Sequence, residues 1–308
     1  MEEKSREFTN NGSELLRESM NDNGTMLEAA LERDLQKDPD HIRNDYELTF
    51  YALRRSGHHA VMVWFAYHFG VPVYVLNDIK PYSDPCKTSH FKDGWDVGSE
   101  WVIAPTTGVE EFRWQKKHCI MISVQDFDLR KLCQNADVIS SGENMLGFSK
   151  KKISIMVLRD PFNLLASRLA KPVPLKELLD PNELFDAWEI YAREFIQESN
   201  FLGNKITVNF NLWFSNLAYR KTLSVQLGMP FTDAGINIVP KAGDGSSFDL
   251  TKFDGRGSEM RVLERWKRYS DDNKFRNSFR GRHTLAALYR RIFPHDEALE
   301  HFLSEIGI

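Results

Sequence analysis

The stretch Leu53-Arg54-Arg55-Ser56-Gly57-His58-His59 combines two arginines with a hydroxyl and a glycine where a strand is expected to turn into a helix. Such a turn leaves backbone N–H groups pointing outward at the helix N-terminus, where the helix dipole favours an anion. Arg54 and Arg55 add positive charge, since a guanidinium can grip a phosphate through two parallel hydrogen bonds, and Ser56 adds a hydroxyl donor. The stretch predicts a site for phosphate or a related anion, although an ordinary positively charged turn would have the same composition.

The residues after Gly57 separate this turn from the nucleoside-triphosphatase loop Gly-x-x-x-x-Gly-Lys-Ser/Thr. His58 and His59 stand where that loop has its lysine and its magnesium-binding hydroxyl. A kinase on the same fold would normally use both groups. A small-molecule kinase remains the alternative function, but the sequence lacks the residues that such an enzyme usually has at this turn. No Cys, Asp or Glu accompanies the two histidines at metal-ligand spacing, and no metal is expected.

A second strand-to-helix turn is expected in the segment 157–168, Val-Leu-Arg-Asp-Pro-Phe-Asn-Leu-Leu-Ala-Ser-Arg. Asp160 is placed to cap the helix and Pro161 suits its first position, while Ser167 falls about two turns into the helix. A well-capped helix accounts for Asp160 and Pro161 but gives no purpose to Arg159 at the carboxyl end of the strand. In open α/β sheets ligands bind at that edge.

The elements that position these turns alternate between strands and helices, which favours a three-layer α/β/α fold with a mostly parallel central sheet. The apolar runs predict strands at residues 47–53, 71–76, 119–124, 153–158 and 205–210. Periodic spacing and stop signals predict helices at residues 58–69, 181–199 and 216–227.

The composition sets outer limits on the class of protein. The chain has 308 residues, 42% of them hydrophobic and 27% charged, which excludes a wholly disordered or collagen-like chain. It contains no run of about 18 apolar residues and does not begin like a signal peptide, so neither a membrane partner nor secretion is expected. Its three cysteines lie far apart and predict no disulfide framework. A soluble, cytoplasmic protein is the resulting expectation.

The formal net charge of −4 hides an uneven distribution. Residues 1–45 carry 12 acidic and 6 basic side chains, whereas the remainder has a slight basic excess. We therefore expect an acidic, flexible leader at 1–45 and one α/β domain at 46–308. Residues 250–293 hold 12 basic and 5 acidic side chains, which indicates either a solvated helical face or a surface for a multiply anionic ligand. A non-catalytic anion-binding or nucleic-acid-binding protein would leave the two turns unexplained, so no nucleic-acid partner is expected.

Taken together, the two turns resemble the signature of the sulfotransferases that use 3′-phosphoadenosine 5′-phosphosulfate (PAPS). In that family the first turn wraps the 5′-phosphosulfate, and Arg55-Ser56-Gly57-His58-His59 stands there. A second motif, Arg-Asp/Asn-Pro with a later serine, binds the 3′-phosphate, and Arg159-Asp160-Pro161 with Ser167 matches it. The resemblance runs from about residue 47 to 269 and implies a P-loop-like fold. It also implies PAPS as co-substrate, no metal, and transfer of the sulfuryl group to a hydroxyl or amine acceptor such as a carbohydrate or small alcohol.

The resemblance assigns roles to individual residues. Arg55 is the candidate for stabilising the bridging oxygen as its bond to sulfur breaks; many family members have lysine there, and arginine keeps the charge but cannot donate a proton. The resemblance also implies a basic lid over the cofactor, formed near Gly255-Arg256-Gly257 and Arg265-Trp266-Lys267. The residues that it implies in binding PAPS are Arg54, Arg55, Ser56, Gly57, His58, His59, Arg159, Ser167 and, from the lid, Arg256.

The general base for the acceptor hydroxyl is less defined. Asp126, just beyond a predicted strand, is the first candidate, although it could equally be a helix cap. His118, Glu143 and His59 remain open alternatives. The aromatic-rich segment 77–115 is the expected region for acceptor recognition unless its rings belong to the core. A relative that binds the nucleotide without catalysis stays possible, and the oligomeric state is not indicated.

Overall fold

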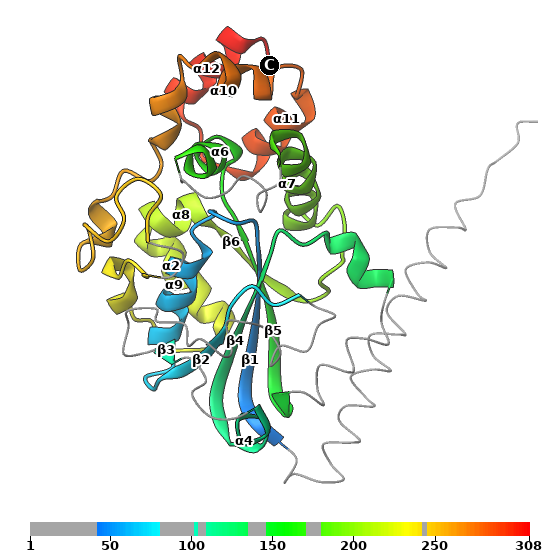
Figure 1. Ribbon diagram of the computed structural model, residues 1–308, viewed down its shortest axis with the longest axis vertical. Coiled ribbons are helices and arrows are strands. Elements are labelled where there is room, and N and C mark those ends of the chain that lie inside the picture. Colours follow the sequence, from blue (N-terminus) through cyan, green and yellow to red (C-terminus); the bar gives the residue numbers. More distant parts are fainter. Residues whose placement is uncertain (1–41, 81–101, 104–108, 135–145, 171–179, 242–244) are drawn as a thin grey trace, which may run out of the picture. The chain divides into compact units, whose positions relative to one another are not determined.

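The computed structural model describes residues 42–80, 102–103, 109–134, 146–170, 180–241 and 245–308 (Figure 1). It divides the chain into a unit ending at Ile42 and a compact unit from Arg43 to Ile308. Most of the expected leader, most of the aromatic segment 77–115 and the candidate Glu143 lie outside the described residues.

A six-stranded sheet forms the centre of the compact unit, in the order β3-β2-β4-β1-β5-β6. Its strands are β1 (Ile42–Ala52), β2 (Val73–Leu76), β3 (Val102–Ile103), β4 (Lys117–Gln125), β5 (Phe148–Leu158) and β6 (Lys205–Asn209). The pairs β1–β4, β2–β3, β2–β4 and β5–β6 are all parallel. The expectation of a three-layer α/β/α fold around a parallel sheet is confirmed, with β1 inside the sheet as the first turn requires.

Successive residues of β5 alternate between the two cores that flank the sheet, as a strand buried on both faces must. Ile155 and Val157 join one hydrophobic cluster, while Met156 and Leu158 join another. The first cluster takes in α2 (His58–Tyr67), α8 (Phe210–Ser215) and α9 (Leu217–Leu227). The second takes in α6 (Pro161–Leu169), α7 (Pro181–Phe195), α10 (Asn273–Phe279), α11 (His283–Ile292) and α12 (Glu297–Ile306), seen at one end of Figure 1.

Strand β1 begins at Ile42, earlier than the apolar run predicted. Asn44 is buried near its start, and its side-chain amide donates to Leu146 O at 3.2 Å, Gly147 O at 3.0 Å and Ser149 Oγ at 3.0 Å. These bonds allow a polar residue inside the sheet. Residues 42–45, which their charge assigned to the leader, therefore belong to the central strand.

A short helix, α4 (Val109–Trp114), precedes β4, and Phe112 packs into a third cluster with Ile120, Ile122 and Val124 of that strand. Within the described ranges, no helix combines the length and the apolar character that crossing a membrane would need.

Candidate functional site

The turn between β1 and α2 is tight and uses backbone conformations that few residues adopt. Arg55 and Gly57 both lie in the left-handed region, with φ of 71° and 83°. The Ser56 N–H donates to Leu53 O at 3.1 Å and closes the turn. A Cβ at position 57 would lie 2.3 Å from the ring of Phe210, so only glycine fits there. The turn thus aims the N-terminus of α2 at the carboxyl edge of the sheet.

The turn between β5 and α6 is fixed by the cap that its sequence predicts. The Asp160 carboxylate accepts the Asn163 N–H at 2.7 Å, and Pro161 occupies the first helical position. The side chain of Asn163 donates to Asp160 and to Leu263 O at 3.0 Å, which ties the cap to the C-terminal segment. Arg159 therefore leaves the end of β5 at a rigid point.

Arg159 lies against the first turn although its guanidinium is almost wholly buried. Its Nη1 donates to Arg55 O at 3.2 Å and to Ser167 Oγ at 3.1 Å, and its Nη2 donates to Val262 O. The guanidinium also stacks over the ring of Phe210, 5.0 Å from its centroid. Its Nε has no hydrogen-bond partner among the described residues. The structure thus brings the two predicted turns together.

Two further arginines converge on the same place. Arg265, in the 3-10 turn Arg265–Tyr269, donates to Ser167 Oγ at 3.3 Å and to Ser246 Oγ at 2.6 Å. Arg55 donates through Nε to Ser247 Oγ at 2.7 Å and through Nη2 to the same hydroxyl. Ser167 thus accepts from two guanidinium groups, and two adjacent serines each accept from one.

Burial, and after it electrostatic repulsion within this group, lowers the pKa values of Arg159 and Arg265. Burial, then the charge of Arg265, lowers the pKa of Arg159 to about 9, against the opposing effect of Asp160. Burial, together with the charge of Arg55 and against the opposing effect of Asp249 at 3.5 Å, lowers the pKa of Arg265 to about 10. Each shift means that the folded protein disfavours the charged form of the guanidinium. A nearby anion with several negative charges would stabilise that charged form.

The two histidines after Gly57 lie in different surroundings. His58 is buried, and burial, then the charges of His59 and Arg55, hold its pKa well below the ordinary value. Its Nδ1 lies 3.4 Å from Ser56 Oγ, whereas its Nε2 has no hydrogen-bond partner within the described ranges. The ring of His59 turns instead toward β2, with Nε2 2.9 Å from Asn77 Oδ1.

Asp126, the first candidate for the base, follows β4 with a left-handed φ of 48° and is held by cations. Its Oδ1 accepts the Arg54 N–H at 2.9 Å and Nη2 of Arg168 at 2.5 Å. Arg168 is buried and also donates to Arg54 O at 3.1 Å. The guanidinium of Arg54 pairs with Asp78 beyond β2, whereas that of Arg55 donates to Ser247.

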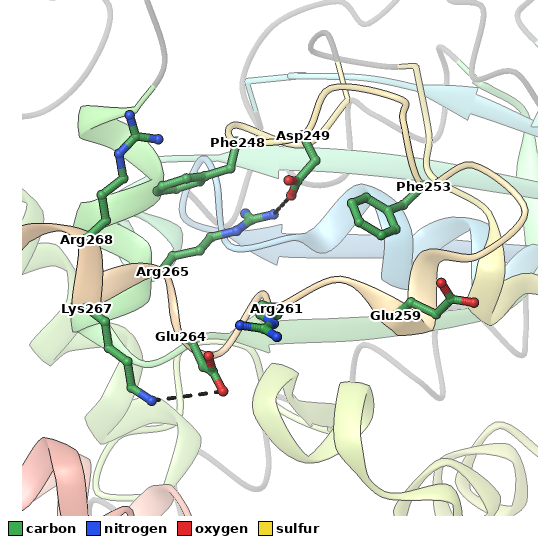
Figure 2. A pocket seen from close by; sticks show the side chains of 9 residues that line it. All are labelled: Phe248, Asp249, Phe253, Glu259, Arg261, Glu264, Arg265, Lys267 and Arg268. Atoms are coloured by element: carbon green, nitrogen blue, oxygen red, sulfur yellow. Dashed lines mark hydrogen bonds and ion pairs between the residues drawn. The ribbon is translucent and has the colours of Figure 1, made fainter.

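Arg256 does not join the arginine group. It is exposed, pairs with Glu259 at 3.3 Å and lies over the ring of Phe253. Arg265, which the resemblance placed only in a basic lid, lies beside Ser167 instead. A cavity of about 380 Å³ opens next to Arg265, and Figure 2 shows its guanidinium reaching Asp249 across one wall.

The basic excess of residues 250–293 is partly neutralised by pairs between helices. These pairs are Arg276–Glu305, Arg282–Asp186, Arg290–Glu300 and Arg291–Glu198. Such pairing favours the interpretation of a solvated helical face for that part of the segment.

No protein-family model matches the chain, and no curated protein matches it either. The function is therefore inferred from the residues of the site. The site has two adjacent groups of hydrogen-bond donors, one at the N-terminus of α2 with Arg55 and one formed by Arg159, Ser167 and Arg265.

Proposed function

We propose that the protein is a PAPS-dependent sulfotransferase that moves a sulfuryl group to a hydroxyl or amine acceptor. The observation that carries the proposal is the convergence of three arginines, two of which follow the ends of β1 and β5. Arg55, Arg159 and Arg265 donate to the hydroxyls of Ser167, Ser246 and Ser247. Their charges repel one another in the absence of a ligand. PAPS carries a 3′-phosphate and a 5′-phosphosulfate, which supply negative charge at two separated points.

Two buried, unpartnered nitrogens support the fit of such a ligand. Arg159 Nε and His58 Nε2 lack hydrogen-bond partners among the described residues, and an unsatisfied buried donor costs about 1 to 3 kcal/mol. Phosphate and sulfonate oxygens would satisfy donors of this kind. In the proposed arrangement the 3′-phosphate binds between Arg159, Ser167 and Arg265. The phosphosulfate binds at the turn that precedes α2.

In the proposed reaction the chain acts by positioning and charge. Sulfuryl transfer resembles phosphoryl transfer, which needs roughly in-line attack and stabilisation of the leaving oxygen. Arg55 is the candidate for the second task because it adjoins the helix N-terminus and keeps its charge at every physiological pH. Ser56 and Gly57 shape the turn, and a carbohydrate or small alcohol is the proposed acceptor.

Calorimetry tests donor binding directly. Adenosine 3′,5′-bisphosphate, the product left after transfer, should bind more tightly than AMP or ATP. Arg159→Ala should abolish that preference, whereas Arg256→Ala, an exposed arginine of the same basic segment, should leave it intact. If the bisphosphate binds no better than AMP, or if Arg159→Ala keeps the preference, the proposed function is wrong. Arg55→Ala should lower sulfuryl turnover far more than bisphosphate affinity.

A further inference from the structure

The proposed transfer requires a group that accepts the proton of the attacking hydroxyl. The candidates for this base lie in different surroundings in the structure. Asp126 is engaged by Arg168 and by the backbone of Arg54, which makes it an anchor between β4, α6 and the β1–α2 turn. His118 lies at the opposite end of the sheet, near the start of β4, where it pairs with Asp45 at 2.9 Å.

His59 lies where the acceptor is expected. It is in the first turn of α2, and its ring extends to Asn77, the residue directly after β2. The 3′-phosphate subsite is on the β5 side of β1, whereas β4 and β2 lie on the other side. An acceptor that approaches the turn opposite the nucleotide therefore meets the ends of β2 and β4.

A chain of buried hydrogen bonds fixes the orientation and the tautomer of His59. Asn77 Oδ1 accepts from Gln125 Nε2 at 2.8 Å, and Gln125 Nε2 also donates to Ser123 Oγ at 3.2 Å. Because Oδ1 is an acceptor only, the Nε2 of His59 at 2.9 Å must be the nitrogen that carries hydrogen. In the neutral ring the basic lone pair is then on Nδ1. A base oriented by a third group is the arrangement found in activated nucleophile systems.

We infer that His59 is the general base of the transfer and that Asn77 is its positioning residue; this inference rests on the proposed function. The acceptor oxygen attacks sulfur and forms the new S–O bond. The bond between sulfur and the bridging oxygen breaks, and its electron pair stays on the 5′-phosphate. The acceptor proton moves to Nδ1 of His59 and leaves to solvent afterwards.

Charged and titratable groups from each neighbouring element influence this ring. His58 lies on the same helix with its ring centroid 4.0 Å away, and it is kept neutral by burial. Arg54 and Arg55 come from the preceding turn. Asp78 follows β2, where it pairs with Arg54 and accepts from Lys80 at 3.2 Å. These groups form a polar rim at the ends of β2 and β4, which suits a hydroxyl-rich acceptor.

Release of adenosine 3′,5′-bisphosphate from PAPS, with water and with glycerol as acceptors, tests the inference on the full chain. We expect His59→Gln to slow release at least about 100-fold. Its affinity for adenosine 3′,5′-bisphosphate should stay within about threefold of wild type. His118→Gln, the matched control at the other end of the sheet, should change neither quantity. Imidazole in solution should partly restore release by His59→Ala.

The pH profile separates a base from a merely structural residue. Asn77→Asp puts a carboxylate beside Nε2, which stabilises the imidazolium and should move the acidic limb of the turnover profile to higher pH. Full activity of His59→Gln overturns the inference. So does loss of turnover in a folded Asp126→Asn variant with His59→Gln unaffected. A wild type that binds the bisphosphate but does not form it from PAPS also overturns it, whereas failure to bind the bisphosphate overturns the proposed function itself.

Discussion

Arg159 is a buried cation that lies close to other positive charges. Its replacement by methionine should therefore lower the free energy of unfolding only slightly. A pKa lowered to about 9 corresponds to about 5 kcal/mol by which the folded state disfavours the charged form. The hydrogen bonds from Arg159 to Arg55 O, Ser167 Oγ and Val262 O offset this by about 1.5 kcal/mol each, because the donor is charged. The two effects nearly cancel, which is expected of a group held in place for a ligand.

Arg159→Met keeps much of the buried stem and removes the charge with its donors. We expect the free energy of unfolding of the unliganded protein to change by less than about 2 kcal/mol in either direction. Bisphosphate binding should lose two charge-assisted hydrogen bonds of about 1.5 kcal/mol each, and its Kd should rise at least about 100-fold.

Urea denaturation and calorimetry on the same samples check both numbers. Phe162→Ala, in the adjoining turn of α6 and fully buried, is the stability control and should cost about 3 to 5 kcal/mol. If Arg159→Met loses as much stability as this control and retains its bisphosphate affinity, Arg159 is a structural ion and the reasoning fails.

Three further outcomes follow from the same contacts. Gly57→Ala should destabilise the protein by at least about 2 kcal/mol in thermal or urea unfolding, because its Cβ meets an aromatic ring and its φ is 83°. Asp126→Ala should cost about 3 to 5 kcal/mol in urea unfolding, since it strands the buried charge of Arg168. Bisphosphate affinity should be steady between pH 6 and 8 and fall in titrations above about pH 9 to 10, where Arg159 and Arg265 lose their protons; an unchanged affinity there would contradict the lowered pKa values.

Strands and caps could be predicted because their signals are local. The run 153–158 and the pair Asp160-Pro161 gave the end of β5 and the start of α6 at the right residues. The N-terminal extension of β1 could not be predicted, since Asn44 is tolerated there only through bonds to residues more than 100 positions away.

The choice among neighbouring arginines also depended on tertiary structure. Arg256 and Arg265 belong to one basic segment built of short 3-10 turns, which have no helical periodicity to show which side faces the sheet. Arg54 and Arg55 are adjacent, and the backbone at Arg55 is left-handed. The side chain of Arg54 reaches Asp78 after β2, whereas that of Arg55 reaches Ser247 in the C-terminal segment. Which arginine faces which neighbour therefore depends on the tertiary structure.

The ring of Phe210 packs against both strand-to-helix turns, below Gly57 on one side and below the Arg159 guanidinium on the other. The two positions are therefore not independent in evolution. A smaller residue at 210 would make room for alanine at 57, yet it would remove the π face under Arg159. A substitution at one turn is tolerated only together with a compensating substitution at the other. Positions 57, 159 and 210 should therefore either be unchanged or vary together among related sequences.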